Sequence, residues 1–338
     1  MILGEQRVDQ CVDRGERGTF AKQILLTESR VPLALVRKRD TRRLRSGRAA
    51  VLLIHGFGQN RYAWHLPSRS FANYLAKVGF DVFNLDLRGH GRSRELGAKG
   101  CTDVEEYVRE DLPAAVDEVR RQSNAHSVFL IGHSLGGLVS YASAPSLNGS
   151  VRGVASIGSP YHFARGSTPL AFLARLAQTI GFLRRPVGKI PVPVRAIGRA
   201  MSLVREFAES PLFPLPLRGW QRGACEPNVL HEHLRLAFDR AGMCEALNLA
   251  DWAVSQKFGG AQNGYDKRFE ELNVPLLVVA GTRDDLAPPL GVRPAYERSH
   301  SSDKHYAEFP LGHIDLLVGK DAPMMTWPLL RHWLLAHS

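Results

Sequence analysis

A serine flanked by glycines follows a short apolar run in the first half of the chain. The run covers residues 128–131, and Gly132, Ser134 and Gly136 then complete the pattern G-x-S-x-G ahead of a helix-like stretch. Glycines permit a turn too tight for larger side chains, and such a turn exposes the serine hydroxyl. The N–H groups and positive dipole end of the following helix favour a developing oxyanion. The pattern predicts a nucleophile at Ser134, although glycine-rich turns also occur as plain connections.

A carboxylate and a histidine that could activate this serine stand in the last quarter of the chain. Asp284 follows the apolar run 276–280, and His313 follows the short run 306–309. A histidine can take the proton of a serine hydroxyl, and a carboxylate can orient that histidine and stabilise its charged form. Ser134, Asp284 and His313 would each follow a strand, and ligands bind at the carboxyl ends of strands in open parallel sheets. We therefore expect the three side chains to project from one edge of the sheet.

A glycine-rich loop over residues 55–60 could supply a hydrogen-bond donor to the same oxyanion. It follows a buried apolar run, and the backbone N–H of Phe57 is the preferred donor. The alternative is an ordinary turn between a strand and a helix. His55 and His133 are interpreted as structural neighbours of the site, and His90 as a turn residue, rather than as bases.

Apolar runs alternate with amphipathic runs along much of the chain, and these elements must position the candidate residues. We expect strands over residues 49–54, 80–85, 128–131, 151–158, 276–280 and 306–309, and helices over 64–78, 102–122, 138–144 and 324–336. Strands that are apolar on both faces and alternate with helices are typical of a mostly parallel sheet covered on both sides. The sequence thus predicts an α/β fold.

The first fifty residues lack this alternation. Residues 1–18 look like a loose lead-in, whereas 20–26 and 31–38 resemble the strands of an antiparallel hairpin at one edge of the sheet. Residues 37–48 are strongly basic, and we expect them to form a solvated loop.

Two local patterns concern the connections around the sheet. Thr102 and Glu105 have the spacing of a capping box at a helix start, and Pro113 could break or kink that helix. Asp86 and Arg88 lie in a glycine-rich turn after a buried strand, and we expect them to hold the turn by pairing with each other.

The composition changes between residues 161 and 265. No strand is evident there, proline and arginine are frequent, and residues 170–183 and 197–207 have helical spacing. We expect residues 1–160 and 266–338 to form the core domain, with residues 161–265 inserted as a helical cap or lid over the site.

The charge of the chain is strongly positive. Its 44 Lys and Arg against 33 Asp and Glu give a formal net charge of +11, and residues 161–210 carry eight Lys or Arg against two Glu. Such a balance favours anionic surfaces, and a basic, apolar cap could touch an anionic membrane, although its apolar faces are expected mainly to pack on the core. No nucleic-acid motif accompanies the charge. His231 and His233 fall on different faces of a helix, which argues against a metal site.

The remaining composition favours an ordinary globular protein. Hydrophobic residues make up 44% and charged residues 23%, and no apolar run reaches the roughly 20 residues of a membrane span. The polar N-terminus shows no secretion signal, and the four scattered cysteines favour free thiols in a reducing compartment. We therefore expect a cytoplasmic protein, without a cofactor site.

These motifs together resemble the α/β-hydrolase superfamily over about residues 20–160 and 270–336. The residues that carry the resemblance are His55-Gly56-Phe57-Gly58, Asp86-Leu-Arg-Gly-His-Gly-Arg-Ser93, Gly132-His-Ser-Leu-Gly-Gly137, Gly281-Thr-Arg-Asp284 and Gly312-His313-Ile-Asp315-Leu-Leu. The chain order of serine, acid and histidine is also the order in that superfamily. The resemblance implies a triad of Ser134, His313 and Asp284, with the backbone N–H groups of Phe57 and Leu135 as the oxyanion hole. The family spacing Gly-x-x-Asp favours Asp284 over Asp285, and Asp315 lies too close to His313 in sequence.

Within the superfamily, the closing Gly-His-Ile-Asp segment is similar to acid-lipase-like and polyester-synthase-like members. The polyester synthases have cysteine in the G-x-S-x-G turn, which is called the nucleophile elbow, whereas this chain has Ser134 there. This difference argues for hydrolysis rather than polymer synthesis. The resemblance implies a serine hydrolase that cleaves a small-molecule carboxylic ester, lipid-like or with another apolar acyl group, through an acyl-enzyme. Two alternatives stay open: an acyltransferase with the same triad, and a non-catalytic binding protein on a hydrolase fold.

Overall fold

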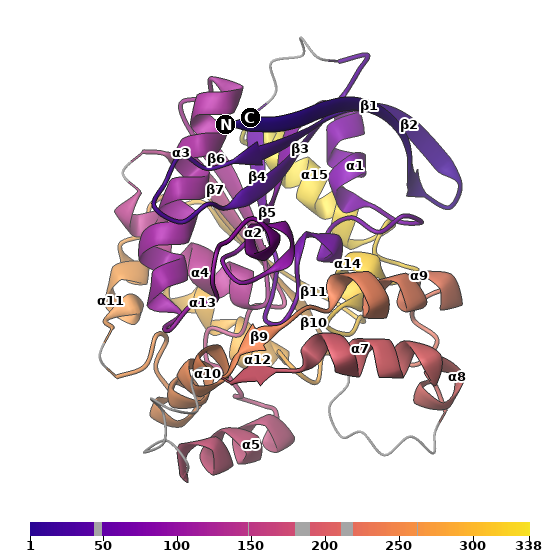
Figure 1. Ribbon diagram of the computed structural model, residues 1–338. Helices are drawn as coiled ribbons and strands as arrows, with labels where there is room; N and C mark the ends of the chain where they lie inside the picture. The colour runs from indigo at the N-terminus through magenta and orange to yellow at the C-terminus, as the bar shows by residue number, and fades with distance from the viewer. Residues whose placement is uncertain (44–48, 148, 180–189, 211–218, 262) are drawn as a thin grey trace.

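A nine-stranded sheet lies at the centre of the described chain, which comprises residues 1–43, 49–147, 149–179, 190–210, 219–261 and 263–338 of the computed structural model (Figure 1). The strands are β1 (Ile2–Asp13), β2 (Glu16–Leu26), β3 (Ala34–Asp40), β4 (Ala50–Ile54), β5 (Asp81–Asp86), β6 (Val128–His133), β7 (Val151–Ile157), β10 (Leu276–Gly281) and β11 (Lys304–Phe309). Their spatial order is β1-β2-β3-β5-β4-β6-β7-β10-β11. Neighbours from β5 to β11 are parallel, and β1, β2 and β3 pair antiparallel. This is the mostly parallel sheet that the sequence predicts.

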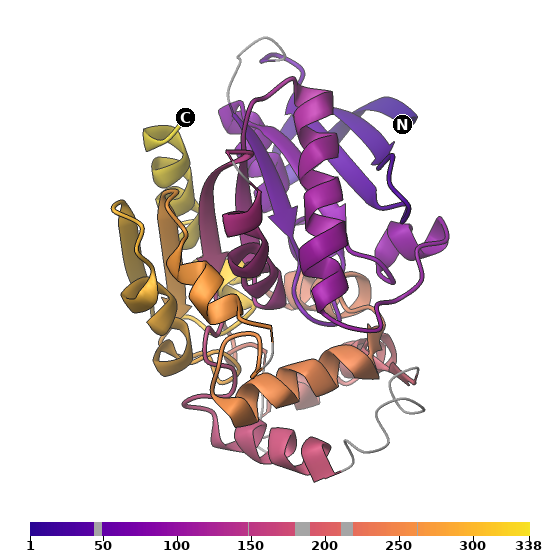
Figure 2. The ribbon, with the colours of Figure 1, turned by 90° about the vertical axis from the view of Figure 1, so that its left-hand side faces the viewer.

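Alternate residues of the central strands feed two hydrophobic clusters, one on each face of the sheet. Val51 and Leu53 of β4 belong to one cluster, and Leu52 and Ile54 belong to the other. This division follows because successive side chains of a strand point to opposite faces. The covering helices are α1 (Phe71–Val78) and α15 (Thr326–Ala336) on one face, and α3 (Leu112–Ser123) and α4 (Leu135–Ser143) on the other (Figures 1 and 2).

The N-terminal edge differs from the expectation. The hairpin of β2 and β3 is confirmed, with Leu26 opposite Ala34, but residues 1–18 are not a loose lead-in because most of them form β1 and the start of β2. Most side chains of β1 are exposed, so the strand is held by backbone pairing and leaves little apolar periodicity in the sequence.

The basic loop expected over residues 37–48 begins later than predicted. Arg37 to Asp40 continue β3, and Arg37 pairs with Asp81 on the neighbouring β5 at 2.5–2.8 Å between guanidinium nitrogens and carboxylate oxygens. A charged strand residue is thus paired within the sheet, which a solvated-loop interpretation does not anticipate. Residues 44–48 lie outside the described residues.

Two expected helices begin later than their sequence patterns indicate. The helix expected over 64–78 is α1, whose first turn is capped by Ser70 accepting a hydrogen bond from the Asn73 N–H. The helix expected over 102–122 begins near Glu105 and continues through a π-helical turn, η2 (Tyr107–Asp111), into α3. The predicted capping box is wrong, because the side chain that accepts from the Thr102 N–H, at 3.1 Å, belongs to Glu106 rather than Glu105. Pro113 is the second residue of α3, which directly follows the π-helical turn, so the irregular hydrogen bonding of the helix coincides with the proline.

We call residues 161–265 the cap, and the described part of it lies at one end of the sheet in both ribbon views (Figures 1 and 2). Their elements are α5 (Thr168–Thr179), β8 (Pro191–Val192), α7 (Val194–Leu203), α8 (Arg205–Ala208), α9 (Pro227–Glu232), the π-helical turn η5 (His233–Ala237), β9 (Ala241–Gly242) and α10 (Met243–Ser255). The prediction that this region has no strand is wrong, because β8 and β9 pair antiparallel, but two-residue strands leave no period in a sequence. The helix expected over 170–183 is α5 as far as Thr179, and residues 180–183 lie outside the described residues. The helix expected over 197–207 is divided between α7 and α8.

Candidate active site

Ser134 stands in the sharp turn between β6 and α4. Its backbone has φ 53° and ψ −120°, a region that non-glycine residues rarely adopt and that is tolerated where the surroundings enforce it. The surroundings require glycine on both sides of the turn. A Cβ on Gly132 would lie 2.3 Å from the Gly137 nitrogen, and a Cβ on Gly136 would lie 2.3 Å from the Ile54 carbonyl oxygen. The G-x-S-x-G pattern is therefore explained by the close approach of α4 to β6 and β4.

Asp284 and His313 are in direct contact beside this turn. The Nδ1 atom of His313 lies 2.7 Å from Oδ2 of Asp284, and both side chains are buried. The other carboxylate oxygen, Oδ1, accepts hydrogen bonds from the N–H groups of Leu286 and Ala287 at 2.9 and 2.8 Å. The carboxylate is thus fixed by its own loop, with one oxygen directed at the imidazole, an arrangement that orients a histidine and stabilises its charged form.

The rival carboxylates occupy other positions. Asp285 is exposed, whereas Asp315 is buried behind His313. Asp315 accepts hydrogen bonds from the backbone N–H groups of Gln221, at 2.7 Å, and Gly312, at 3.1 Å. Burial raises the pKa of Asp315 to about 6, and these hydrogen bonds only partly oppose the rise. Asp315 holds the loop that carries His313, and Asp284 contacts the imidazole.

A cavity of about 410 Å³ opens onto Ser134 and His313, and Phe57 and Leu135 also line it. Most of its wall is apolar and comes from both the core and the cap. Representative lining side chains are Phe163, Leu173, Val194, Phe238, Leu249 and Ile314. A cavity of this size with one polar end fits a ligand that has an apolar chain and a single reactive polar group.

Two backbone N–H groups are free beside the serine. Within the described residues, neither the N–H of Phe57 nor that of Leu135 donates a hydrogen bond to another protein group. Leu135 is the first residue of α4, so its N–H belongs to the open end of that helix. Gly56 packs against the serine, because a Cβ there would lie 3.1 Å from the Cβ of Ser134. Both donors thus stand at the cavity where an oxyanion would form.

Comparison with known proteins identifies the family. A family model described as alpha/beta hydrolase fold matches residues 49–320, which is most of the chain. This chain belongs to the α/β-hydrolase family. The resemblance inferred from the sequence is confirmed, and with it the α/β fold class.

Relatives of this α/β hydrolase include lipases and a polymerase subunit. A monoacylglycerol lipase of Mycolicibacterium smegmatis is 26% identical over 292 residues, which cover 86% of this chain and 89% of the lipase. The PhaC subunit of a poly(3-hydroxyalkanoate) polymerase from Haloferax mediterranei is 26% identical over 303 residues, which cover 85% of this chain and 59% of the subunit. The solved monoacylglycerol lipase of Paleococcus ferrophilus has a TM-score of 0.57 at 21% identity, over 99% of this chain and 100% of that one. This last likeness shows a shared fold.

Three other histidines near the site of this α/β hydrolase are buried and have lowered pKa values. Burial lowers the pKa of His55 to about 4 and that of His233 to about 3, and it lowers the pKa of His133 well below its ordinary value. His55 accepts a hydrogen bond from the Leu87 N–H at Nε2, and the Nε2 atom of His133 lies 3.2 Å from the carbonyl oxygen of His313. His55 and His133 therefore brace the loops around the site, as the sequence interpretation of structural neighbours proposes.

The expected pairing of Asp86 with Arg88 is wrong. Asp86 accepts hydrogen bonds from the backbone N–H and the guanidinium of Arg61, at 2.7 and 2.6 Å. Arg88 instead points to η2, where it contacts Asp111 at 2.7 Å and Glu110 at 2.6 Å. The two side chains leave the turn on different sides. Asp86 holds the end of the loop over residues 55–60, which we call the oxyanion loop after the donor that the sequence predicts there, and Arg88 holds η2.

Two polar residues that sequence reasoning missed, Gln59 and Asp239, meet at this loop. Gln59 accepts a hydrogen bond from the Gly56 N–H at 3.2 Å, and its Nε2 lies 3.5 Å from Nε2 of His233 in the cap. Asp239, also in the cap, contacts both the oxyanion loop and the turn after β5. More than 140 residues separate Gln59 from His233 and Asp239 from these partners, so no local motif could have joined them.

No metal centre is evident among the residues that the structure describes, because no group of three His, Cys, Asp or Glu side chains there is placed to hold a metal ion. The four cysteines are thiols, and the Sγ atoms of Cys101 and Cys244 lie 3.9 Å apart between core and cap.

Proposed function

We propose that this α/β hydrolase cleaves carboxylic esters with an apolar acyl chain through a triad of Ser134, His313 and Asp284. The observation that carries the proposal is the strained serine that shares an apolar cavity with a histidine already bonded to a buried carboxylate. In this reaction the Ser134 Oγ attacks the acyl carbonyl while His313 takes its proton. The imidazolium then protonates the leaving alcohol, and water activated by the neutral imidazole releases the acid from the acyl-enzyme.

The N–H groups of Phe57 and Leu135 are proposed to stabilise the tetrahedral intermediate. Within the described part of the chain neither group donates another hydrogen bond, and both residues line the cavity onto which Ser134 opens. One donor of this kind contributes about 3 kcal/mol of transition-state stabilisation. Because these donors are backbone groups, their positions depend on the loops that carry them rather than on their own side chains.

The comparisons support a hydrolase that acts on ester bonds. The relatives and structural neighbours include monoacylglycerol lipases and an esterase of Thermogutta terrifontis. Acyl transfer to another acceptor is the second candidate, because one relative is a polymerase subunit. Adding primary alcohols or thiols to the reaction separates the two: transfer yields the new ester or thioester, whereas an unchanged product spectrum favours hydrolysis.

The direct test measures hydrolysis of p-nitrophenyl esters from two to sixteen acyl carbons by the wild type, Ser134→Ala and His313→Ala. We expect activity in the wild type alone, and a preference for chains that fill the apolar cavity, since each buried methylene contributes about 0.8 kcal/mol. Full activity of folded Ser134→Ala would refute the proposal.

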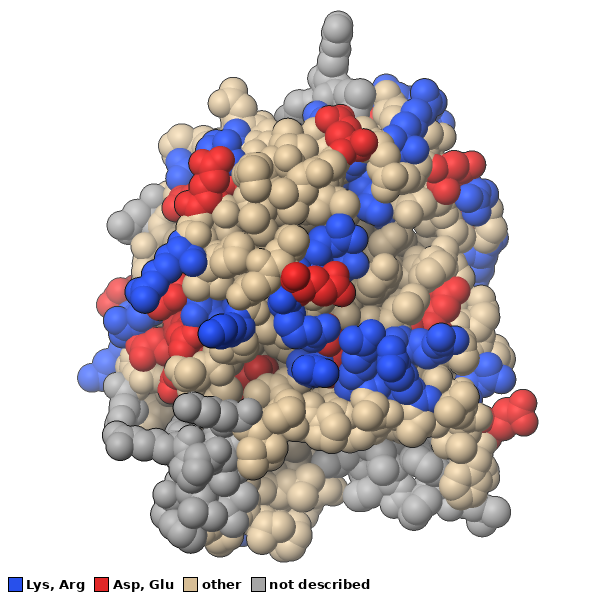
Figure 3. Space-filling view, viewed as in Figure 1, with Lys and Arg blue, Asp and Glu red and all other residues tan. Residues whose placement is uncertain are grey.

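Peripheral contact of the cap with an anionic membrane is a further part of the proposal. Helix α5 exposes Phe172 and Leu176, and α8 exposes Phe207. Arg195, Arg199 and Arg240 line one hollow of the cap, and Figure 3 shows Lys and Arg side chains gathered over this part of the molecule. An apolar surface flanked by basic side chains is typical of proteins that lie on a membrane. Among the described residues, no helix has the length and apolar character needed to cross one.

Flotation with vesicles tests this contact. Vesicles that contain anionic phospholipid should carry the wild type upward at low salt, and neutral vesicles should carry less of it. Phe172→Asp with Leu176→Asp should weaken binding to both kinds of vesicle. Absence of binding to anionic vesicles at low salt would refute the membrane contact without affecting the proposed chemistry.

A further inference from the structure

The cap pairs directly with the loop that carries the Phe57 N–H. The Asn60 N–H donates to the Ala237 carbonyl oxygen at 3.0 Å, and the Asp239 N–H donates to the Gly58 carbonyl oxygen at 2.7 Å. Gln59 and Phe238, which lie between these partners, form an antiparallel bridge. The oxyanion loop therefore has a cap segment as its hydrogen-bonded neighbour, and the peptide between Gly58 and Gln59, two peptides beyond the Phe57 N–H, is tied to that segment through the Gly58 carbonyl.

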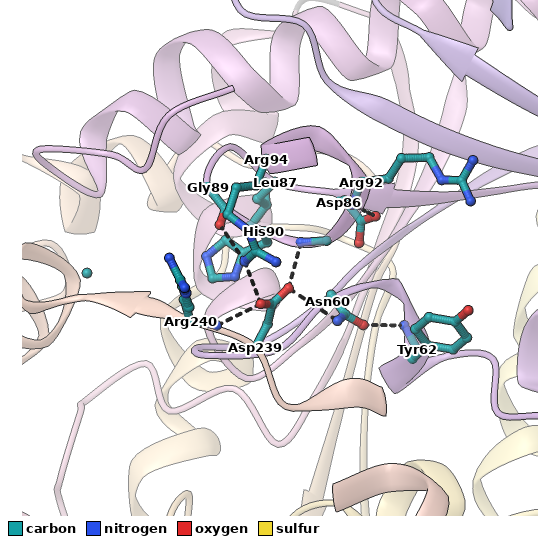
Figure 4. Close-up of polar contacts among 12 residues, drawn as sticks. Asn60, Tyr62, Asp86, Leu87, Gly89, His90, Arg92, Arg94, Asp239 and Arg240 are labelled. Atoms are coloured by element: carbon teal, nitrogen blue, oxygen red, sulfur yellow. Dashed lines mark hydrogen bonds and ion pairs between the residues drawn. The ribbon is translucent and has the colours of Figure 1, made fainter. Parts of the chain in front are cut away.

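The carboxylate of Asp239 fixes this cap segment to the core. It accepts hydrogen bonds from the Gly91 N–H at 2.6 Å, from the Arg94 guanidinium at 2.5 Å, and from the Arg240 N–H at 2.8 Å. The Asn60 side-chain amide donates to it at 3.3 Å, so the same carboxylate also touches the oxyanion loop. Figure 4 shows Asp239 between Asn60 on one side and Arg94 and Arg240 on the other. The side chain is only 2% exposed.

The donors around Asp239 keep it ionised. Burial alone would raise the pKa of this carboxyl, but the Arg94 guanidinium and the N–H groups of Gly91 and Arg240 lower it to about 2. A buried carboxylate with this many donors is a rigid anchor, because displacing it would leave a charge without partners. The anchor therefore persists at every pH at which a serine triad operates.

The end of β5 and the turn that follows it hold both ends of the oxyanion loop. Asp86 accepts the Arg61 N–H at 2.7 Å, and His55 accepts the Leu87 N–H at 3.1 Å. Between these two fixed points the loop passes through Gly58, whose φ is +62° and where a Cβ would lie 3.0 Å from Val194 of α7. The middle of the loop thus has the cap as its support at Gly58, in addition to the contact of the Gln59 side chain with His133 of the core.

We propose that Asp239 is a positioning residue that aims the Phe57 N–H at the oxyanion through the Gly58 and Asn60 contacts. The cap is then part of the oxyanion-hole scaffold, and a displacement of the cap changes transition-state stabilisation as well as access to the cavity. The inference rests on the proposed ester hydrolysis, because it deepens the role of that same site. A purely structural Asp239 would hold the cap in place without any effect on the reaction of bound substrate.

The test compares Asp239→Asn with Glu226→Gln. Glu226 is a matched control, because it is also a cap carboxylate bound to a core arginine, Arg69, at 2.7 and 2.8 Å, and no contact joins it to the oxyanion loop in the described structure. For p-nitrophenyl butyrate, Asp239→Asn should lower kcat about ten-fold, less than the 10²–10³-fold of deleting a donor outright, and should change KM less than about two-fold. Glu226→Gln should lose stability while keeping the wild-type kcat.

An alkyl boronic acid gives a second readout. Its tetrahedral adduct with Ser134 places an oxygen where the oxyanion would lie, so its inhibition constant should rise in Asp239→Asn by the same factor as kcat falls. If Asp239→Asn does not fold, Arg94→Met takes its place; it removes one donor from the carboxylate, and we expect about a three-fold fall in kcat and an equal rise in the inhibition constant.

The outcomes separate the two claims. An inactive wild type would refute the proposed ester hydrolysis. An active wild type with an unchanged kcat in the folded Asp239 variant, or with equal losses of kcat in the Asp239 and Glu226 variants, would overturn the positioning role alone.

Discussion

At the scale of residues, the account depends on three side chains whose surroundings differ in kind. Ser134 has a strained backbone conformation, Asp284 is held by two backbone N–H groups, and His313 is held by Asp284. The sequence indicates all three by motif and chain order. It could not indicate Gln59 or Asp239, because what places them at the site is contact between distant segments rather than local spacing.

Asp284→Asn should lower kcat on the order of 10³–10⁴-fold with little loss of stability. The amide oxygen can still accept from Leu286 and Ala287, and the amide NH₂ would then face Nδ1 of His313. This arrangement forces the imidazole proton onto Nε2, where it prevents the base from accepting the serine proton. Steady-state hydrolysis of p-nitrophenyl butyrate measures the effect. Asp285→Asn is the control and should stay active; the reverse pattern would assign the acid to Asp285.

The stability of the protein should fall as the pH is lowered from 7 to 5. The buried histidines with lowered pKa are His55, His65, His133 and His233. Because the unfolded state binds protons near pH 6.5 and the folded state does so only at lower pH, the stabilisation present above pH 6.5 is lost as the pH falls below that value. Asp315, with its pKa raised to about 6, opposes this trend by binding a proton in the folded state first.

Urea unfolding at pH 7 and pH 5 measures this balance. Each of these histidines should contribute a loss on the order of 2 kcal/mol at pH 5, so the net loss should exceed that of a single histidine despite the opposing effect of Asp315. The loss should be smaller in His233→Gln, which has no titrating group at residue 233. Equal unfolding free energies at the two pH values would contradict the burial of neutral histidines.

At the scale of elements, the accuracy of the sequence predictions follows burial. The central strands are buried on both faces, so their apolar runs marked them in the sequence. Strand β1 has mostly exposed side chains, and β8 and β9 have two residues each, so none of the three carried a usable period. The pairing of Asp86 was misjudged because sequence distance favoured Arg88, whereas the strand directs the carboxylate toward Arg61.

The elbow is the element with the least tolerance for added volume. Gly136→Ala would place a Cβ 2.3 Å from the Ile54 carbonyl oxygen and 2.6 Å from that of His55, and both belong to backbone that cannot yield cheaply. We expect a loss of about 1–3 kcal/mol in unfolding free energy and a large loss of activity. Gly4→Ala is the matched control, because a Cβ at Gly4 meets nothing within 4 Å. Thermal unfolding and ester hydrolysis of both variants check this, and wild-type behaviour of Gly136→Ala would contradict the packing described.

At the scale of the whole molecule, the sheet supplies the proposed triad, and the cap supplies part of the wall of the cavity beside it. A change in composition marks residues 161–265 in the sequence, and several of their side chains line the cavity that opens onto Ser134. The sequence did not predict that residues 237 and 239 pair with the oxyanion loop, because neither that cap segment nor the loop has a regular hydrophobic period. The division of the chain into a core domain and a cap stays a prediction, which limited proteolysis can examine.

The central claim is that Ser134 is an activated nucleophile, and labelling with a fluorophosphonate probe tests it most directly. The wild type should be labelled in a stoichiometric and time-dependent manner, and Ser134→Ala, shown by circular dichroism to be folded, should not be labelled. Mass spectrometry should locate the adduct on the peptide that contains Ser134. Labelling of Ser134→Ala to the same extent, or an adduct on another serine, would contradict the account.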